Sequence, residues 1–199
     1  MQDTFVRMLS EVQLLNWLEI TAVLTALIYV FLASKGNKWC FVFGLISSAI
    51  YVYITLKFNL YFDVIINIYY VAMSYFGWIS WSNEKDNEPI QISHVPKKQL
   101  QSFILIGFLV TLILAFLAEY LTDAELACFD AFTTTFAIIA TYMVVKKQLE
   151  NWLIWIIVDL VASGMYFYKE LYFTSLLFLI YTIIAVFGYV KWKRIITLG

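Results

Sequence analysis

Seven long apolar stretches dominate this chain of 199 residues. Four of them contain no Asp, Glu, Lys or Arg, and several neighbours are joined by only a few residues. A helix that crosses the hydrocarbon core of a bilayer needs roughly 20 mostly apolar residues. We therefore expect an all-α integral membrane protein whose seven transmembrane helices lie at residues 15–34, 39–56, 64–81, 102–121, 131–145, 152–168 and 171–190.

The composition argues against most other classes of protein. Hydrophobic residues make up 63% of the chain and charged residues 14%, against roughly half and a quarter in soluble domains. A net charge of −1 offers no basic surface for nucleic acid. One histidine and two cysteines are too few for a metal centre, a disulfide framework or the clustered groups of a membrane enzyme. A retinal protein would need a lysine deep in its last helix, where Lys191 comes only at the end. We expect no cofactor and no enzymatic activity.

The positive charges fix the expected orientation. With seven spans, ten of the 13 lysines and arginines fall on one side of the membrane, and short loops rich in Lys and Arg stay cytoplasmic. The N-terminus is then outside, whereas the linker 82–101 and the tail 193–199 are cytoplasmic. Residues 1–14 lack the basic start and apolar run of a signal peptide, and we interpret them as a short interfacial segment. The expected location is the bacterial inner membrane.

Two parts of the sequence resemble one another. The first contains SSAIYVY, LYF, a glycine and a tryptophan, and the second contains ASGMYFY followed by the same three features. From LYF onward the offset in residue number between the copies is constant at 111, but it is 115 for the segments upstream. We therefore expect four extra residues, about one helical turn, in the first copy. The matched positions are 47–53, 60–62, Gly77 and Trp81 against 162–168, 171–173, Gly188 and Trp192.

The positions of the two copies predict the architecture. They correspond to spans one to three and five to seven, so the two repeats have the same orientation in the membrane. We expect two parallel three-helix bundles at 15–81 and 126–192, joined by a linking helix at 102–121. Parallel repeats around a site near the bilayer midplane are a known transporter architecture.

An acidic residue in the sixth span is the strongest sign of a binding site. Asp159 lies near the middle of 152–168, where an acid costs about 2.5–3.5 kcal/mol on insertion scales. Trp152 and Trp155 precede it by seven and four residues, so the three side chains share a helix face, which Tyr166 continues. Two indoles and a carboxylate suit a flat cationic ring. The alternative is a protonated Asp159 bonded between helices, with the tryptophans as interface anchors.

Other polar residues within the spans are further candidates for substrate binding. Thr133 and Thr134 lie close to Asp130 on the fifth span, Asn67 lies on the third and Ser47 on the second. Each of these side chains has an alternative structural role, because hydroxyls and amides also form hydrogen bonds between transmembrane helices.

Taken together, seven motifs make the chain resemble the PnuC family of bacterial vitamin transporters over essentially its whole length. The resemblance implies a fold like that of SWEET-type sugar carriers and assembly as a homotrimer. It also implies facilitated diffusion of an unphosphorylated vitamin, which a cytoplasmic kinase then traps as its phosphate. Consistently, the chain has no Walker A motif. The motifs are LEI (18–20), KGNKW (35–39), LYFD (60–63), GWISW (77–81), DAFTT (130–134), ENWLIWIIVD (150–159) and YKELYFTSLLF (168–178).

The resemblance also implies a substrate. The binding signature of the family is W-x-x-W-x-x-x-N/D, which here is Trp152, Trp155 and Asp159. Asp at the last position is typical of the thiamine-type (PnuT) members, and Asn of those that transport nicotinamide riboside. Asn67 stands where the latter typically have Gln. We therefore expect thiamine uptake. Nicotinamide riboside transport and a proton-coupled carrier in which Asp159 titrates are the alternatives.

Overall fold

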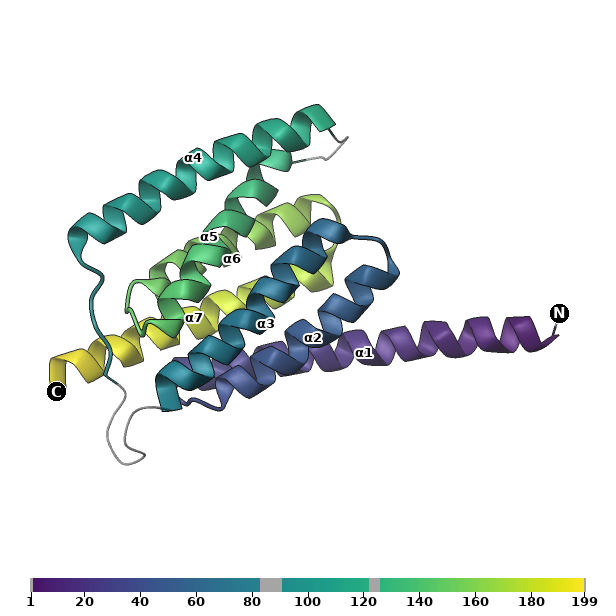
Figure 1. The fold of residues 1–199 in the computed structure, drawn as a ribbon, viewed down its shortest axis with the longest axis horizontal. Helices are drawn as coiled ribbons and strands as arrows, with labels where there is room; N and C mark the ends of the chain where they lie inside the picture. Colours follow the sequence, from purple (N-terminus) through teal and green to yellow (C-terminus); the bar gives the residue numbers. More distant parts are fainter. Residues whose placement is uncertain (1, 83–90, 122–125, 199) are drawn as a thin grey trace. The chain divides into compact units, whose positions relative to one another are not determined.

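The computed structural model describes residues 2–82, 91–121 and 126–198, which form seven α-helices (Figure 1). Each helix is long and apolar enough to cross a membrane. The predicted all-α fold class with seven transmembrane helices is therefore confirmed. The helices are α1 (Gln2–Ser34), α2 (Cys40–Lys57), α3 (Tyr61–Ser82), α4 (Lys97–Leu121), α5 (Ala127–Val145), α6 (Asn151–Tyr168) and α7 (Tyr172–Leu198).

The two outermost helices are longer than their predicted spans. The backbone of α1 is helical from Gln2, so most of the segment 1–14 continues the first transmembrane helix without a break. At the other end, α7 runs on to Leu198 and takes in most of the predicted tail. The interfacial position of residues 1–14, the cytoplasmic position of the linker and the proposed domain boundaries stay predictions.

The chain divides into two compact units. The first holds α1 up to Leu32 together with α2 and α3, and the second holds the short segment 33–36 and α4 to α7. Within the first unit α2 packs against α3. Within the second unit α4 packs on α5, α5 on α6, and α6 on α7 (Figure 1). The linking helix α4 thus packs on the same unit as α6, the helix that carries most of the candidate site.

Four helices end in the same hydrogen-bonded turn. In α2, the N–H of Leu60 donates to the Thr55 carbonyl at 2.9 Å, and the N–H of Asn59 donates to the Leu56 carbonyl at 3.1 Å. This is a Schellman motif, which satisfies the last carbonyls of a helix and requires a left-handed residue after its end. Only one of the four left-handed residues is a glycine. They are Gly36 after α1, Asn59 after α2, Lys147 after α5 and Glu170 after α6.

These turns show that the predicted four-residue insertion is wrong. The same offset of 111 relates Gly36 to Lys147 and Asn59 to Glu170, and α2 and α6 each have 18 residues. The offset of 111 therefore holds upstream of LYF as well. The match at 115 is displaced by four residues, about one turn. A helix face looks similar after such a displacement, so the small residues and tyrosines matched in either register.

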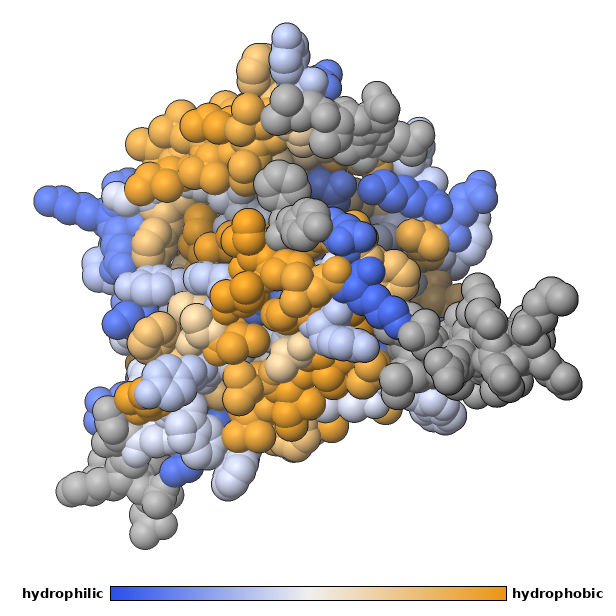
Figure 2. All heavy atoms as spheres, turned by 45° about the vertical axis from the view of Figure 1, so that its right-hand side comes forward, coloured by the Kyte–Doolittle hydropathy of each residue, from blue (hydrophilic) through white to orange (hydrophobic). Residues whose placement is uncertain are grey.

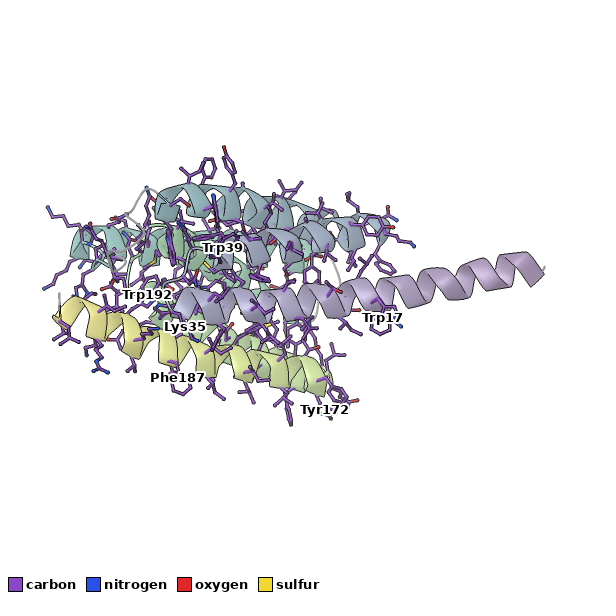
Figure 3. The ribbon with its side chains drawn as sticks, turned by 90° about the horizontal axis from the view of Figure 1, so that it is seen from below. Trp17, Lys35, Trp39, Tyr172, Phe187 and Trp192 are labelled. Carbon is purple, nitrogen blue, oxygen red and sulfur yellow. The ribbon has the colours of Figure 1, made fainter. Side chains whose placement is uncertain are left out.

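Most large apolar side chains on the helices are exposed rather than buried. On α4, Leu105, Leu112 and Phe116 are each more than 60% exposed. Apolar side chains cover much of the face in Figure 2, as expected for a surface that faces lipid. On α7, Tyr172 and Phe187 project outward, whereas Trp192 is fully buried (Figure 3). This distribution agrees with a multi-pass membrane protein.

Candidate functional site

Four of the predicted site residues lie on α6, which starts directly after the tight corner that ends α5. The corner closes through the N–H of Gln148, which donates to the Met143 carbonyl at 3.0 Å. The rise of about 1.5 Å per residue places Asp159 roughly 6 Å along the helix axis from Trp155. An indole and a carboxylate one turn apart on one face match the dimensions of a single aromatic ring with a polar substituent.

Asp159 is nearly inaccessible and is not paired. Its side chain lies in the second unit with only 4% of its residue surface exposed. In residues 2–82, 91–121 and 126–198, no group forms a hydrogen bond or ion pair with its carboxylate. Buried polar groups are almost always hydrogen-bonded, and a buried charge without a partner is costly. The unpaired carboxylate is therefore compatible with the predicted role of Asp159 in substrate binding, which stays a prediction.

Trp155 lies beside this carboxylate with part of its surface open. It is half-buried and packs against a cluster formed by Phe136 and Ala137 of α5 and Val158 of α6. The cluster supports one side of the indole and limits its rotation. A ring held in this way by α5 is preorganised to stack on a flat ligand, because little side-chain freedom is lost on binding.

Trp152 lies in a different environment from Trp155. Its residue surface is 2% exposed and its ring meets that of Trp192 edge to face, with centroids 5.4 Å apart. A Cβ atom at Gly188 would lie 2.7 Å from its ring atoms Cδ2 and Cε2. The indole thus fills the contact between α6 and α7, and only a glycine at 188 lets the two helices approach so closely.

The first unit contains the same packing at the equivalent positions of the repeat. Phe41 takes the place of Trp152, and its ring meets that of Trp81 edge to face at 4.9 Å. A Cβ atom at Gly77 would collide with the Phe41 ring. The arrangement of aromatic residue, glycine and tryptophan is therefore part of the repeated scaffold, and Trp152 follows this repeat.

Trp155 and Asp159 are not part of this repeated packing. Their equivalents in the first unit are Gly44 and Ser48. Tyr29 of α1 covers Gly44, since a Cβ atom there would lie 2.9 Å from the Tyr29 ring atom Cδ2. The residue equivalent to Tyr29 is Ala140, which is fully buried in the second unit. One copy thus carries its aromatic ring on the first helix of the repeat, and the other carries it on the second helix.

The remaining candidates on α5 and α6 make mostly local contacts. Tyr166 stacks on Phe178 of α7, with ring centroids 5.3 Å apart and planes at 10°. The Thr133 hydroxyl donates to the Phe129 carbonyl of its own helix at 3.0 Å, and Thr134 is half-buried. These contacts leave Thr133 and Thr134 near the start of α5, where hydroxyl oxygens still have free lone pairs.

Two polar residues of the second unit were not predicted as site residues. The hydroxyl of Thr135 is buried without a hydrogen-bond partner in the described part of the chain, and the same holds for the Oδ1 atom of Asn151. Thr135 directly follows Thr133 and Thr134 but lies on a different face of the helix. A prediction based on the face of Thr133 and Thr134 therefore missed it. Asn151 directly precedes Trp152. It was missed because the prediction relied on the spacing of the two tryptophans. Only the burial of these residues distinguishes them.

The last two candidates belong to the first unit. The Ser47 hydroxyl donates to the Ala22 carbonyl of α1 at 2.9 Å and so connects two helices. Asn67 is half-buried, and its amide donates to the Asp63 carbonyl one turn earlier at 2.8 Å. The candidates on α5 and α6 thus belong to the second unit, and Ser47 and Asn67 belong to the first. Substrate binding by all eight candidates stays a prediction.

Comparison with known proteins identifies the family. A family model described as "Nicotinamide mononucleotide transporter" matches residues 16–194 of the chain. The chain belongs to this family. It is therefore a membrane transporter of the bacterial inner membrane and not an enzyme, as expected.

Several relatives and one solved structure are similar to this chain over most of its length. The nicotinamide riboside transporter PnuC of Escherichia coli (strain K12) is 23% identical, with 89% of this chain and 85% of the relative covered. PnuC proteins of Neisseria mucosa and Haemophilus influenzae are 24% and 22% identical, with 91% of this chain covered in each case and 73% and 81% of the relatives. A crystal structure of the vitamin B3 transporter PnuC has a TM-score of 0.72 at 22% identity and covers 92% of this chain and 83% of its own. The likeness supports the fold.

Proposed function

We propose that this transporter carries nicotinamide riboside across the bacterial inner membrane. The observation that carries the proposal is the buried, unpaired carboxylate of Asp159 beside the half-buried indole of Trp155. The pyridinium ring of nicotinamide riboside is flat and cationic, so it suits stacking on the indole and neutralises the carboxylate. The relatives in three bacteria, all described as nicotinamide riboside transporters, support this substrate.

The substrate is proposed to be the riboside rather than the mononucleotide that the family description names. A phosphate group is bound by cationic side chains or by backbone N–H groups at helix ends. The sequences of α5 and α6 contain no Lys or Arg, and an acid such as Asp159 offers no positive charge to a phosphate. These features favour an uncharged ribose over a ribose phosphate.

Thiamine is the second candidate, and the comparisons do not support our preference for it, because every relative named above is described by nicotinamide riboside. One observation still favours thiamine, namely the carboxylate at position 159, where the family resemblance associates Asp with thiamine. A carboxylate suits an aminopyrimidine, because it accepts a hydrogen bond from the amino group.

The proposed mode of transport is facilitated diffusion by a homotrimer, with a cytoplasmic kinase that traps the vitamin as its phosphate. These features follow from the family resemblance, and the absence of a Walker A motif from the sequence is consistent with them. A proton-coupled carrier is the alternative mode, because a carboxylate such as that of Asp159 is a typical proton relay within membranes.

Calorimetric titration of the purified protein tests the substrate. Nicotinamide riboside, thiamine and nicotinamide mononucleotide are titrated separately into the same preparation. We expect nicotinamide riboside to bind at least tenfold more tightly than the other two. Tighter binding of thiamine would replace the first candidate by the second, and tight binding of the mononucleotide would contradict the argument from charge.

Uptake into proteoliposomes tests the mode of transport. Facilitated diffusion predicts that the initial rate depends on the vitamin gradient alone and is the same with and without a pH gradient. Accumulation against the vitamin gradient when a pH gradient is imposed would show coupling to protons. Liposomes that contain the Trp155→Ala variant provide the matched control for leakage.

A further inference from the structure

Residues 91–96 lead into α4 and lie against the corner between α5 and α6; we call this segment the strap. The N–H of Ser93 donates to the Lys147 carbonyl at 3.0 Å, and the Ser93 carbonyl accepts from the N–H of Leu149 at 2.9 Å. These two bonds form an isolated parallel bridge between Ser93 and Gln148. The backbone of the strap is therefore bonded to the backbone of the corner at Ser93.

A single carboxylate completes the attachment. Oε2 of Glu150 accepts from the N–H of Val95 at 2.9 Å, and its Oε1 lies 2.8 Å from Nδ1 of His94. The side chain of Glu150 is 16% exposed and that of His94 is 62% exposed. Because Glu150 directly precedes the first residue of α6, it joins the strap to the start of the helix that carries Trp155 and Asp159.

Three buried polar atoms at this corner have no hydrogen-bond partner among the described residues. They are Oε1 of Gln148, Oδ1 of Asn151 and Nε1 of Trp152. Gln148 is the residue that the strap bridges, and the other two lie within the next turn. A buried polar group without a partner destabilises the arrangement that buries it. The corner to which the strap is attached thus contains three buried groups that destabilise it.

The attachment is specific to the second copy of the repeat. The position equivalent to Glu150 is Trp39, which is 54% exposed and meets Trp78 edge to face at 5.2 Å. An aromatic side chain there accepts no hydrogen bonds of the kind that Glu150 receives from the strap. The carboxylate therefore occurs in the copy that also contains the unpaired Asp159.

We propose that Glu150 is a positioning residue that holds the strap closed over the start of α6, and that release of the strap opens this end of the second unit during transport. The proposal rests on the proposed function, because it assigns a moving part to a transporter. The closed state gains the hydrogen bonds of the strap, whereas in the proposed open state water reaches the three unpartnered groups. Opposing effects of this kind keep two states close in free energy, as a gate requires.

A reversible disulfide tests whether the strap must move. Neighbouring strands lie about 4.8 Å apart, so the bridged pair Ser93→Cys and Gln148→Cys falls within the distance that a disulfide spans. The exposed native Cys128 is replaced by Ser to prevent mispairing. Uptake of nicotinamide riboside and its equilibrium affinity are measured with the disulfide oxidised and reduced, and each single-cysteine variant is oxidised as the control.

We expect oxidation to lower the uptake rate at least tenfold, to leave the affinity within threefold, and to be reversed by reductant. Unchanged uptake by the oxidised protein would overturn the proposal, because the strap would then be a static element. Absence of binding by the reduced protein would instead contradict the proposed substrate. Hydrogen exchange, which needs no substrate, then tests whether Glu150 holds the strap.

Hydrogen exchange tests the role of Glu150 without any substrate. In Glu150→Ala we expect the amides of Val95 and Leu149 to exchange at least tenfold faster, with an intermediate effect in Glu150→Gln, which keeps one oxygen acceptor. Glu119→Ala, which removes an exposed acid from α4, is the matched control and should leave these amides unchanged. Equal protection in Glu150→Ala and in the parent would show that Glu150 does not hold the strap.

Discussion

At the scale of single residues, the two tryptophans of α6 differ in environment although they lie only three positions apart. Trp152 is enclosed between α6 and α7, and its equivalent in the first unit is also a buried aromatic residue. Trp155 is half-buried, and its equivalent is a glycine. The repeat thus acts as an internal control, from which we expect a scaffold role for Trp152 and substrate binding by Trp155.

Truncation of the two indoles should therefore have different effects. Trp155→Ala should weaken vitamin binding about tenfold or more, since an aromatic stacking contact contributes roughly 1–3 kcal/mol. Trp152→Phe, which introduces the residue of the first copy, should leave the affinity within about threefold. Titration calorimetry measures both effects. Unchanged affinity in a folded Trp155→Ala protein would remove Trp155 from the site.

Asp159→Asn should separate the two candidate substrates. A carboxylate accepts a charge-assisted hydrogen bond, worth roughly 1.5–3 kcal/mol, from the amino group of thiamine, so thiamine affinity should fall about ten- to hundredfold. An amide both donates and accepts and so still pairs with the carboxamide of nicotinamide riboside, whose affinity should change less than threefold. Titration of the variant with both vitamins measures this. Equal losses for both would show that the charge alone attracts them.

At the scale of helices, close approach between α6 and α7 depends on a residue without a side chain. Gly188 lies under the ring of Trp152, and Gly77 lies under the ring of Phe41 in the same position of the first copy. A hydrogen-bonded pair also connects α6 and α7, since the hydroxyl of Ser163 lies 3.0 Å from that of Ser175. The second unit is therefore held together by contacts on both sides of the candidate site.

A glycine-to-alanine pair tests this packing. Gly188→Ala should lower the free energy of unfolding by about 1–3 kcal/mol, the usual cost of overpacking, because its Cβ atom meets the Trp152 ring at 2.7 Å. Gly164→Ala on α6 is the matched control, since its Cβ atom meets nothing within 4 Å. Alanine there should raise stability by up to about 1 kcal/mol through its higher helix propensity. Thermal unfolding in detergent measures both, and similar shifts would contradict the close packing at Gly188.

At the scale of the whole molecule, the orientation in the membrane stays a prediction from the charges. Native Cys128 lies near the start of α5 and is exposed, which places it on the predicted outer side. An impermeant thiol reagent should label it in intact cells, whereas a cysteine introduced at the exposed Gln91 should react only after permeabilisation. Cys128→Ser provides the background for the second measurement. The opposite pattern would reverse the topology.

The number of helices could be predicted because hydrophobicity over the length of a span reports directly on membrane crossing. Asp159 could be predicted because an acid within an apolar span is costly wherever its neighbours lie. The packing of Trp152 could not, since Gly188 lies on the next helix and nothing in the spacing pairs them. The register of the repeat was wrong for a related reason, because helical periodicity hides a displacement of one turn.

The two units carry large and small side chains at different positions of the repeat, and this difference bears on how such proteins diversify. Tyr29 fills the space over Gly44 in one duplicate, whereas Ala140 leaves the equivalent position small in the duplicate that carries Trp155. The two halves of a repeated fold can thus place an aromatic ring on different helices while both keep the same packing of aromatic residue, glycine and tryptophan. Engineering of new cargo should then concentrate on Trp155 and Asp159 of α6, with the first unit left as an unaltered template.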